Sequence, residues 1–274
     1  MISIVVLREI VTQGGILGLV TIAAFITSRV IRIDDLTLEG SFSAGSGLVA
    51  ALVHASLPLV VALPVSFFFG GFLGIGTGLL HERLGINNVL SGLCMTALLF
   101  SVNLAMVGAY ASIPAAILPH FFKIPMPLIV LLVLVMVYGV VATLLKSSLG
   151  LCMVASGYSP TMVQSFGRNP AFFKIAALAI ANGIAALAGA LFAFHTGFYS
   201  ITGNVGILIG ALSGLLIGSV MNARFSVWLL VGALAQQVIF AVIISAGLNP
   251  VWNTALKAVL IIVLVAGFQT KERN

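Results

Sequence analysis

The sequence predicts an all-α polytopic membrane protein with about nine transmembrane helices. Two observations support this fold class. Of the 274 residues, 61% are hydrophobic and 7% are charged, whereas a soluble domain carries about 25% charged residues. The apolar residues also form runs near the roughly 20 residues that a helix needs to cross a bilayer. No polar stretch is long enough to fold alone, so residues 1–274 are interpreted as a single transmembrane domain.

Nine apolar segments follow one another along the chain, and each is expected to be a helix because a helix satisfies its own backbone polar groups in lipid. They span residues 10–28, 40–56, 58–80, 88–109, 127–145, 171–194, 205–221, 226–246 and 253–269. Arg8 and Glu9 precede the first segment, and no small-residue cleavage site follows it. The first segment is therefore interpreted as a retained span rather than a signal peptide.

The distribution of charge predicts the orientation in the membrane. With the N-terminus outside and the C-terminus in the cytoplasm, nine basic residues lie at or near the cytoplasmic face and three do not. The nine are Arg29, Arg32, Arg83, Lys146, Arg168, Lys174, Arg224, Lys271 and Arg273. The net charge of +6 is thus attributed to basic membrane loops, and no nucleic-acid partner is expected.

This topology predicts an inverted repeat. The first four and last four spans run in opposite directions around the fifth, and short glycine-bearing segments occupy matching places at 40–56 and 205–221. Such segments indicate a substrate pathway in transporters. One face of segment 205–221 carries glycines at intervals of four: Gly206, Gly210, Gly214 and Gly218. This spacing favours close helix packing, either within one subunit or between subunits.

Motifs for catalysis and metal binding are absent from the sequence. It contains no nucleotide-binding P-loop, no H-E-x-x-H and no G-x-S-x-G, and its four histidines and two cysteines lack metal-ligand spacing. The chain is therefore not expected to be an enzyme or to hold a metal or cofactor of its own.

Three of the six acidic residues lie in the stretch RIDDLTLEGSF, between the first two apolar segments. Asp34 and Asp35 are placed to pair with Arg29 or Arg32, and Asp35 is also placed to cap the second helix. Glu39 falls one turn inside that helix, where an ionisable group indicates either a translocation pathway or a structural pairing.

Hydroxyl groups continue along the same segment, where they either line a path or bond to their own helix. They belong to Thr37, Ser41, Ser43 and Ser46. The residues predicted to lie along a translocation path are Asp35, Thr37, Glu39, Ser41 and Ser43.

The longest polar stretch between spans is 146–170, on the predicted cytoplasmic side. Its pattern predicts a short helix near 149–156, a turn at 157–160 and a second short helix near 161–166. The sequence Gly-Arg-Asn-Pro at 167–170 then ends that helix and opens the next span. The stretch is either a plain connecting loop or a docking element for a partner's groove.

The pattern L-G-x-x-x-x-A-x-G in this loop, with G-R-N after it and N-G-I-A-A-L-A-G-A-L in the next span, resembles the permeases of bacterial ABC importers. The family handles branched-chain amino acids, ribose and related solutes. The matching residues are Leu149, Gly150, Ala155, Gly157, Gly167, Asn182, Gly183, Leu187, Ala188 and Gly189. Many members have an arginine before the Ala-x-Gly and an asparagine after it, where this chain has Val154 and Ser159.

The stretch D-L-T-L-E-G-S-F at 35–42 resembles the segment that interrupts an early helix beside the translocation pathway in the same family. The chain is most similar to the short permeases that pair with binding proteins of the tryptophan type. The resemblance makes 146–170 the ATPase-coupling loop. The residues expected to act there are Leu149, Gly150, Ala155, Gly157, Tyr158, Ser159, Met162, Gly167 and Arg168.

The resemblance implies the transmembrane subunit of an ATP-driven importer that moves a small solute, an amino acid, by alternating access. The implied partners are a second permease subunit in a homodimer or heterodimer, two ATPase subunits that bind ATP and Mg²⁺, and an extracytoplasmic solute-binding protein. The implied location is the bacterial cytoplasmic (inner) membrane. The outer loop 110–126 is interpreted as an interfacial aromatic loop or as part of the docking surface for the binding protein.

The acidic residues of the chain also bear on two other classes of function. A stand-alone ion-coupled transporter needs an acid within a span, and only Glu39 qualifies because the third to ninth spans contain no Asp or Glu. An intramembrane enzyme needs a catalytic pair, and the sequence offers none.

Overall fold

The computed structural model describes residues 4–55, 57–107, 125–199, 206–221, 225–245, 255–259 and 261–263. Every regular element in these ranges is helical, which confirms the predicted all-α class. The elements are α1 (Ile4–Phe25), the π-helical turn η1 (Ile26–Val30), α2 (Thr37–His54), α3 (Leu59–Glu82), α4 (Asn88–Val107), α5 (Met126–Lys146), α6 (Ser148–Tyr158), α7 (Pro160–Ser165), α8 (Pro170–Thr196), α9 (Ile207–Met221) and α10 (Trp228–Ser245).

Within the described ranges, five helices are long and apolar enough to cross a membrane: Val6–Val30, Leu59–Glu82, Asn88–Ala105, Met126–Lys146 and Pro170–Thr196. The predicted segments up to 226–246 each overlap a helix of the structure. Of the ninth segment only 255–259 and 261–263 are described, and these residues are helical. The outer loop 110–126 lies outside the described residues except at its last two positions. The number of membrane crossings and the side of each terminus stay predictions.

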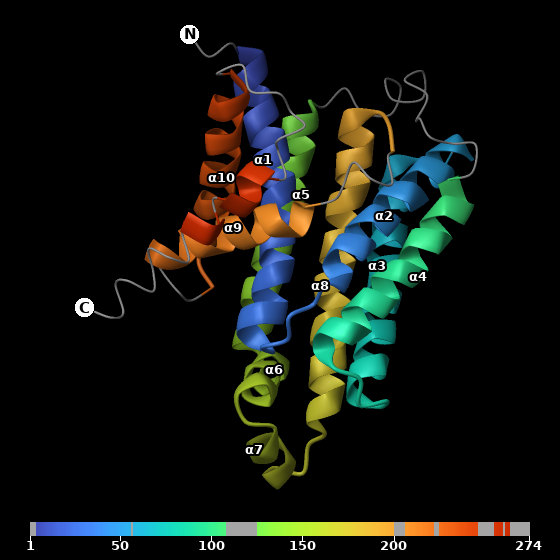
Figure 1. Cartoon of the computed structure of the whole chain (residues 1–274), viewed down its shortest axis with the longest axis vertical. Coiled ribbons are helices and arrows are strands. Elements are labelled where there is room, and N and C mark those ends of the chain that lie inside the picture. The colour runs from blue at the N-terminus through green and yellow to red at the C-terminus, as the bar shows by residue number, and fades with distance from the viewer. Residues whose placement is uncertain are drawn as a thin grey trace.

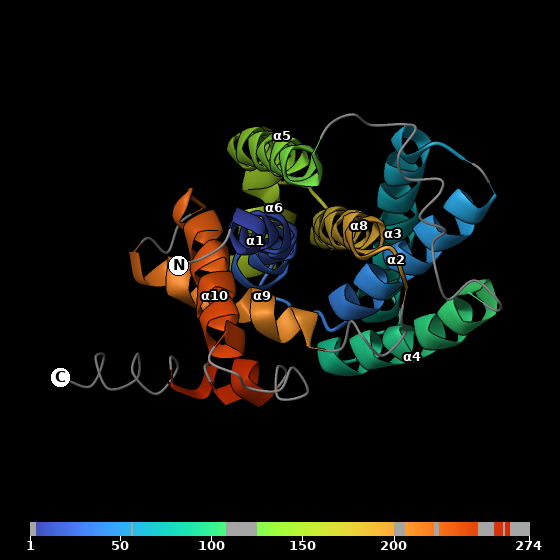
Figure 2. The same ribbon diagram turned by 90° about the horizontal axis from the view of Figure 1, so that it is seen from above.

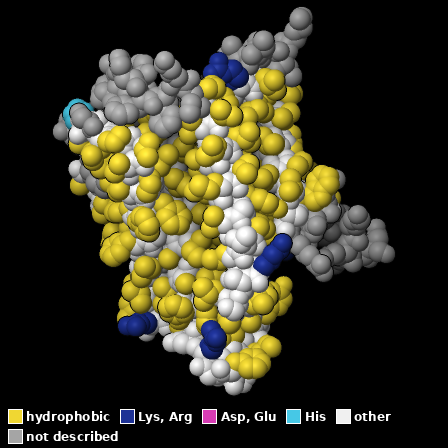
Figure 3. Space-filling view, turned by 180° about the vertical axis from the view of Figure 1, so that it is seen from behind, with side chains coloured by type: hydrophobic (Ala, Val, Ile, Leu, Met, Phe, Trp, Pro, Cys, Tyr) yellow, Lys and Arg dark blue, Asp and Glu magenta, His cyan; other side chains and the backbone are white. Residues whose placement is uncertain are grey.

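α1 and α8 lie side by side at the centre of the bundle (Figure 1). We compared the most apolar 18-residue stretch of each spanning helix. In this stretch 89% of the residues are buried in the first helix, which runs from α1 into η1, and 72% in α8, against 33% in α3 and 22% in α4 and in α5. The outer helices therefore expose apolar side chains such as Phe68, Phe72 and Leu132, as helices that face lipid do. Hydrophobic side chains cover most of the face in Figure 3, and the visible Lys and Arg lie mainly toward its lower end.

The helices around this central pair pack in a reciprocal way. α2 and α3 pack on α8, while α9 and α10 pack on α1. The two groups lie on opposite sides of the pair, with α4 outside α2 and α5 next to α1 (Figure 2). Each half of the chain thus places its second and third helices against the central helix of the other half. An inverted repeat would produce this exchange, although the repeat itself stays a prediction.

Glycines let α2 and α3 approach the backbone of α8. A Cβ at Gly45 in α2 would overlap the backbone of Ala186, and a Cβ at Gly189 in α8 would overlap the backbone carbonyl of Phe42. A Cβ at Gly70 in α3 would overlap Ala186 as well. The N-G-I-A-A-L-A-G-A-L stretch of α8 is therefore its packing surface for two neighbouring helices.

Candidate functional site

The chain breaks between η1 and α2, and Asp35 organises the start of α2. Its Oδ1 accepts a hydrogen bond from the backbone N–H of Thr37 at 2.8 Å, so the predicted helix cap is present. Its Oδ2 accepts a hydrogen bond from the side-chain amide of Asn182 in α8 at 2.8 Å. The predicted pairing of Asp35 with Arg29 or Arg32 is wrong, because Asp35 is only 5% exposed and points into the core.

Asn182 continues this network toward α2. Ser41 Oγ donates a hydrogen bond to Asn182 Oδ1 at 2.6 Å, and the Asn182 amide also donates to the Leu178 carbonyl at 3.0 Å. Every polar group in the network has a partner, as polar groups in an apolar interior require. Asn182 belongs to the family motif carried by α8, but no role was predicted for it from the sequence. Its signal was an amide inside an otherwise apolar span.

Glu39 connects the two short helices α2 and α9. Its Oε1 accepts a hydrogen bond from the backbone N–H of Gly206 at 3.1 Å, just before α9 begins at Ile207. A carboxylate at this place caps α9 and complements its dipole. Lys257 lies against the same turn of α9, with its Cδ and Cε 3.6 Å from where a Cβ on Gly210 would stand. The charges of Glu39 and Lys257 are near enough to interact, and sequence analysis did not connect these two residues.

The other hydroxyl groups of α2 bond to neighbouring elements. The bonds are Thr77 Oγ1 to Thr37 Oγ1 at 3.0 Å, Ser43 Oγ with Tyr199 Oη at 3.2 Å, and Ser46 Oγ to the Gly189 carbonyl at 2.8 Å. Burial raises the pKa of Tyr199, because the phenolate would lose its water shell. These bonds hold α2 against α3, α8 and the residues after α8. A role for the hydroxyls along a path stays a prediction.

The predicted pair of short helices between α5 and α8 is confirmed as α6 and α7. The predicted turn at 157–160 is wrong in its extent, because α6 continues to Tyr158, α7 begins at Pro160 and only Ser159 lies between them. Ser147 and Ser159 cap them, accepting from the backbone N–H groups of Gly150 at 3.3 Å and Met162 at 3.4 Å. Gly167 has φ of +71°, which ends α7, and Asn169 then caps α8. We call residues 146–170 the coupling segment. It extends beyond the end of the bundle in Figure 1.

The residues predicted to act in the coupling segment divide between two faces. Leu149, Tyr158, Met162, Gly167 and Arg168 are exposed, and Ser159 and Ala155 are half-buried. Gly150 and Gly157 face inward: a Cβ on Gly150 would overlap the backbone of Leu144 and Leu145, and a Cβ on Gly157 would overlap the backbone of Val30 and Ile31. The glycines therefore seat α6 against the bundle, while the longer side chains face outward.

Two adjacent clefts mark the outward face of the coupling segment. One, of about 400 Å³, is lined by Leu151, Cys152, Ala155, Met162, Val163, Phe166 and Arg168. The other, of about 330 Å³, is lined by Leu149, Arg168, Asn169, Phe172 and Phe173. Arg168 borders both, so a basic group stands between two apolar depressions.

The four glycines predicted on one face of α9 have different surroundings. Gly206 precedes the helix and has φ of +85°. A Cβ on Gly210 would meet Leu17 at 3.4 Å, an ordinary contact. Gly214 and Gly218 lie against the backbone of α10, where a Cβ would come within 3.0 Å of Ala233 Cα and 2.6 Å of the Trp228 carbonyl oxygen.

A cavity of about 580 Å³ lies between α3, α5 and α8 and is lined by apolar residues such as Leu63, Phe67 and Leu132. Since it offers no polar side chain, it is not a site for a polar solute. In the described part of the chain, no three His, Cys, Asp or Glu side chains gather where they could hold a metal ion.

Comparison with known proteins identifies the family of the chain. Residues 6–266 match the family described as "Branched-chain amino acid transport system / permease component". The chain is 29% identical over 273 residues to the tyrosine transport system permease protein of Clostridioides difficile, covering 97% of this chain and 91% of the relative. It is 26% identical over 265 residues to an uncharacterized protein of Rickettsia prowazekii, covering 91% and 92%. No solved structure matches significantly. The chain belongs to the branched-chain amino acid transport permease family.

Proposed function

We propose that this chain is the transmembrane subunit of an ATP-driven importer for an amino acid, and that a separate ATPase subunit hydrolyses the ATP. The family match supports the permease role, and the name of the tyrosine transport relative supports an amino acid as solute. The observation that carries the proposal is the coupling segment, a short helical element that extends from the bundle and exposes apolar side chains beside Arg168.

The coupling segment is suited to seat in a groove of an ATPase. Met162 is 53% exposed and Phe166 is 73% exposed, and they border the same cleft as Arg168. Apolar side chains around an arginine are typical of the centre of a protein interface. On this proposal, closure of two ATPase subunits moves α6 and α7, and the spans respond by alternating access.

We place the coupling segment in the cytoplasm, the N-terminus outside, and the whole chain in the bacterial inner membrane. The basic residues that the structure describes support this orientation. Those near the coupling segment, or at helix ends on its side of the bundle, are Arg29, Arg32, Arg83, Lys146, Arg168 and Lys174. The Lys174 ammonium also pairs with Glu82 at 2.8 Å, which ties the end of α3 to the start of α8.

The buried starts of α2 and α9 are the proposed border of the translocation path. Glu39 from the first half and Lys257 from the second half both contact the first turn of α9. Opposite charges next to a helix start suit a zwitterionic solute. A second permease subunit would complete the path, and an extracytoplasmic binding protein would deliver the solute.

Affinity purification of the tagged chain from native membranes in mild detergent tests this proposal. We expect a stoichiometric P-loop ATPase in the purified complex. Met162→Asp should weaken the association at least about tenfold, because it places a charge in the apolar cleft. Asn87→Asp is the matched control: it adds the same charge at an exposed site on the same side of the bundle and keeps an acceptor for the Val89 N–H.

The alternative, a stand-alone ion-coupled transporter, makes a different prediction. It would purify without an ATPase and move solute in liposomes under an ion gradient. The acid that the sequence predicts for its ion site is Glu39, whose carboxylate accepts a hydrogen bond from Gly206 in this structure. Solute uptake without an ATPase would overturn the importer proposal.

A further inference from the structure

The inner face of the coupling segment contacts the residues that join η1 to α2. We call residues 31–36 the linker. Gly157, in the last turn of α6, lies so close to Val30 and Ile31 that a Cβ would stand 2.8 Å from Ile31 Cα. No side chain separates the two backbones here. A displacement of the end of α6 therefore acts directly on the start of the linker.

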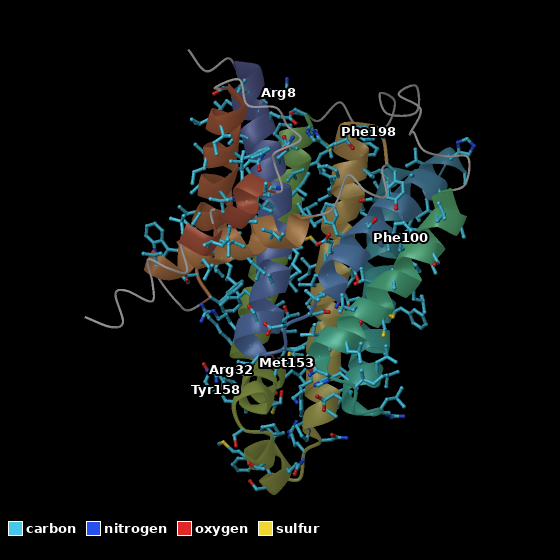
Figure 4. All side chains as sticks on the ribbon, viewed as in Figure 1. Arg8, Arg32, Phe100, Met153, Tyr158 and Phe198 are labelled. Carbon is cyan, nitrogen blue, oxygen red and sulfur yellow. The ribbon has the colours of Figure 1, made fainter. Side chains whose placement is uncertain are left out.

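The next residue on each side strengthens this contact. The guanidinium Cζ of Arg32 lies 3.6 Å from the centroid of the Tyr158 ring, within the range of a cation–π interaction. Figure 4 shows the two side chains together at the lower end of α1, next to α6. Tyr158 is 62% exposed, so one face of its ring carries Arg32 while much of the ring stays open to a partner.

The backbone of Arg32 is itself unusual. Its φ is +56°, and among the described residues no other non-glycine residue has a positive φ. Residues with a Cβ atom rarely adopt this left-handed conformation, so the surrounding structure has to hold Arg32 in it. The Ile33 N–H bonds to the Thr27 carbonyl at 2.9 Å on one side, and the Tyr158 ring holds the side chain on the other.

The far end of the linker is fixed to three helices. Asp35 bonds to Thr37 at the start of α2 and to Asn182 of α8. The Leu36 carbonyl accepts a hydrogen bond from Thr96 Oγ1 of α4 at 3.3 Å. Only two residues separate Arg32 from Asp35, so the linker has little slack to absorb a shift at its first end.

We propose that Arg32 is a positioning residue that locks the linker to Tyr158, so that movement of the coupling segment is passed to the start of α2. This inference rests on the proposed function, because it takes the coupling segment as the part that an ATPase moves. When Tyr158 shifts, Arg32 loses the contact that holds its left-handed backbone. It can then relax, and the start of α2 moves with it.

Hydrogen exchange of the purified chain tests the lock without any ATPase. Tyr158→Leu removes the ring face, and we expect at least about tenfold faster exchange of the amides in residues 31–36. Tyr158→Phe keeps the face and should match the wild type within about twofold. Equal exchange in all three proteins would overturn the proposal.

Transport by the complete complex supplies the second test. With the permease, ATPase and binding protein in liposomes, Tyr158→Leu and Arg32→Ala should each lower solute moved per ATP about tenfold. Arg32→Ala, which changes no residue of the coupling segment, should leave basal hydrolysis and complex assembly within about twofold of the wild type. The double variant should be no worse than either single one, because the two side chains act as a unit. The proposed role of Arg32 would be refuted if the double variant lost transport by the product of the two single losses, or if Arg32→Ala transported like the wild type.

The two proposals fail in different ways. If the wild-type chain moves no solute with ATP, the proposed function is wrong, whatever the exchange data show. If the wild type transports normally and the variants do so as well, the importer function stands and the role of Arg32 is wrong.

Discussion

α2 and α9 occupy matching places in the two halves of the chain, but different interactions hold them. α2 is fixed to α8 by the buried Asp35–Asn182–Ser41 network and by backbone contact at Gly45 and Gly189. α9 packs on α10 through glycines, and its start is capped by Glu39 from α2. We therefore expect α2 to be the more firmly anchored helix and the start of α9 to depend on α2.

The same glycine substitution in each helix should give the largest contrast. Gly45→Ala in α2 places a methyl group into the backbone of Ala186, which cannot rotate away, so we expect a loss of about 3 kcal/mol. Gly210→Ala in α9 meets Leu17 at 3.4 Å and should be neutral or stabilise the helix by up to about 1 kcal/mol. Thermal unfolding in detergent measures both. Similar midpoints for the two variants would show that the helices are anchored alike.

Removal of the cap of α2 should also cost more stability than removal of the cap of α9. Asp35→Ala leaves the Thr37 N–H and the Asn182 amide without their acceptor, and we expect a loss of about 2 kcal/mol. Asp35→Asn keeps an oxygen for the Thr37 N–H but turns an NH2 group toward the Asn182 amide donor, so it should recover only the part of the loss that belongs to the cap. Glu39→Ala removes one acceptor from a less buried site and should cost about 1 kcal/mol. A larger loss for Glu39→Ala than for Asp35→Ala would reverse the comparison.

Sequence reasoning located the helices because their signals are local. The apolar runs set their extents, and Asn169, Pro170 and Gly167 set the start of α8 from adjacent positions. The bonds that join the site link residues far apart in sequence: 147 positions separate Asp35 from Asn182, and 167 separate Glu39 from Gly206. Hydrophobic periodicity does not encode such pairings, because they depend on which helix crosses which.

The glycine pattern shows the same limit within one segment. Equal spacing predicted one packing face on α9, yet Gly206 stands before the helix and serves as the donor to Glu39. Gly214 and Gly218 pack on α10, as close spacing allows. The spacing alone did not distinguish Gly206, whose N–H binds Glu39, from the glycines that pack on α10, because all of them follow one another at intervals of four.

Substitution of Glu39 by glutamine separates its structural role from its charge. Glutamine keeps a side-chain oxygen for the Gly206 N–H, so stability should change by less than about 1 kcal/mol. Removal of the charge that faces Lys257 should lower ATP-driven solute uptake about tenfold, equivalent to about 1.4 kcal/mol in the barrier. Uptake assays in liposomes and thermal unfolding of the same preparation measure the two effects. Unchanged uptake by Glu39→Gln would assign Glu39 to structure alone.

A smaller loss of stability than that of Asp35→Ala is expected where α2 meets the residues after α8. Tyr199→Phe removes the hydrogen bond with Ser43 and should lower stability by about 1 kcal/mol, the net value of one neutral bond. Ser43→Ala removes the same bond from its other end. If that bond is the whole interaction, the double variant should be no less stable than the less stable single variant. Additive losses in thermal unfolding would mean that each side chain has another partner and that α2 is held here by packing instead.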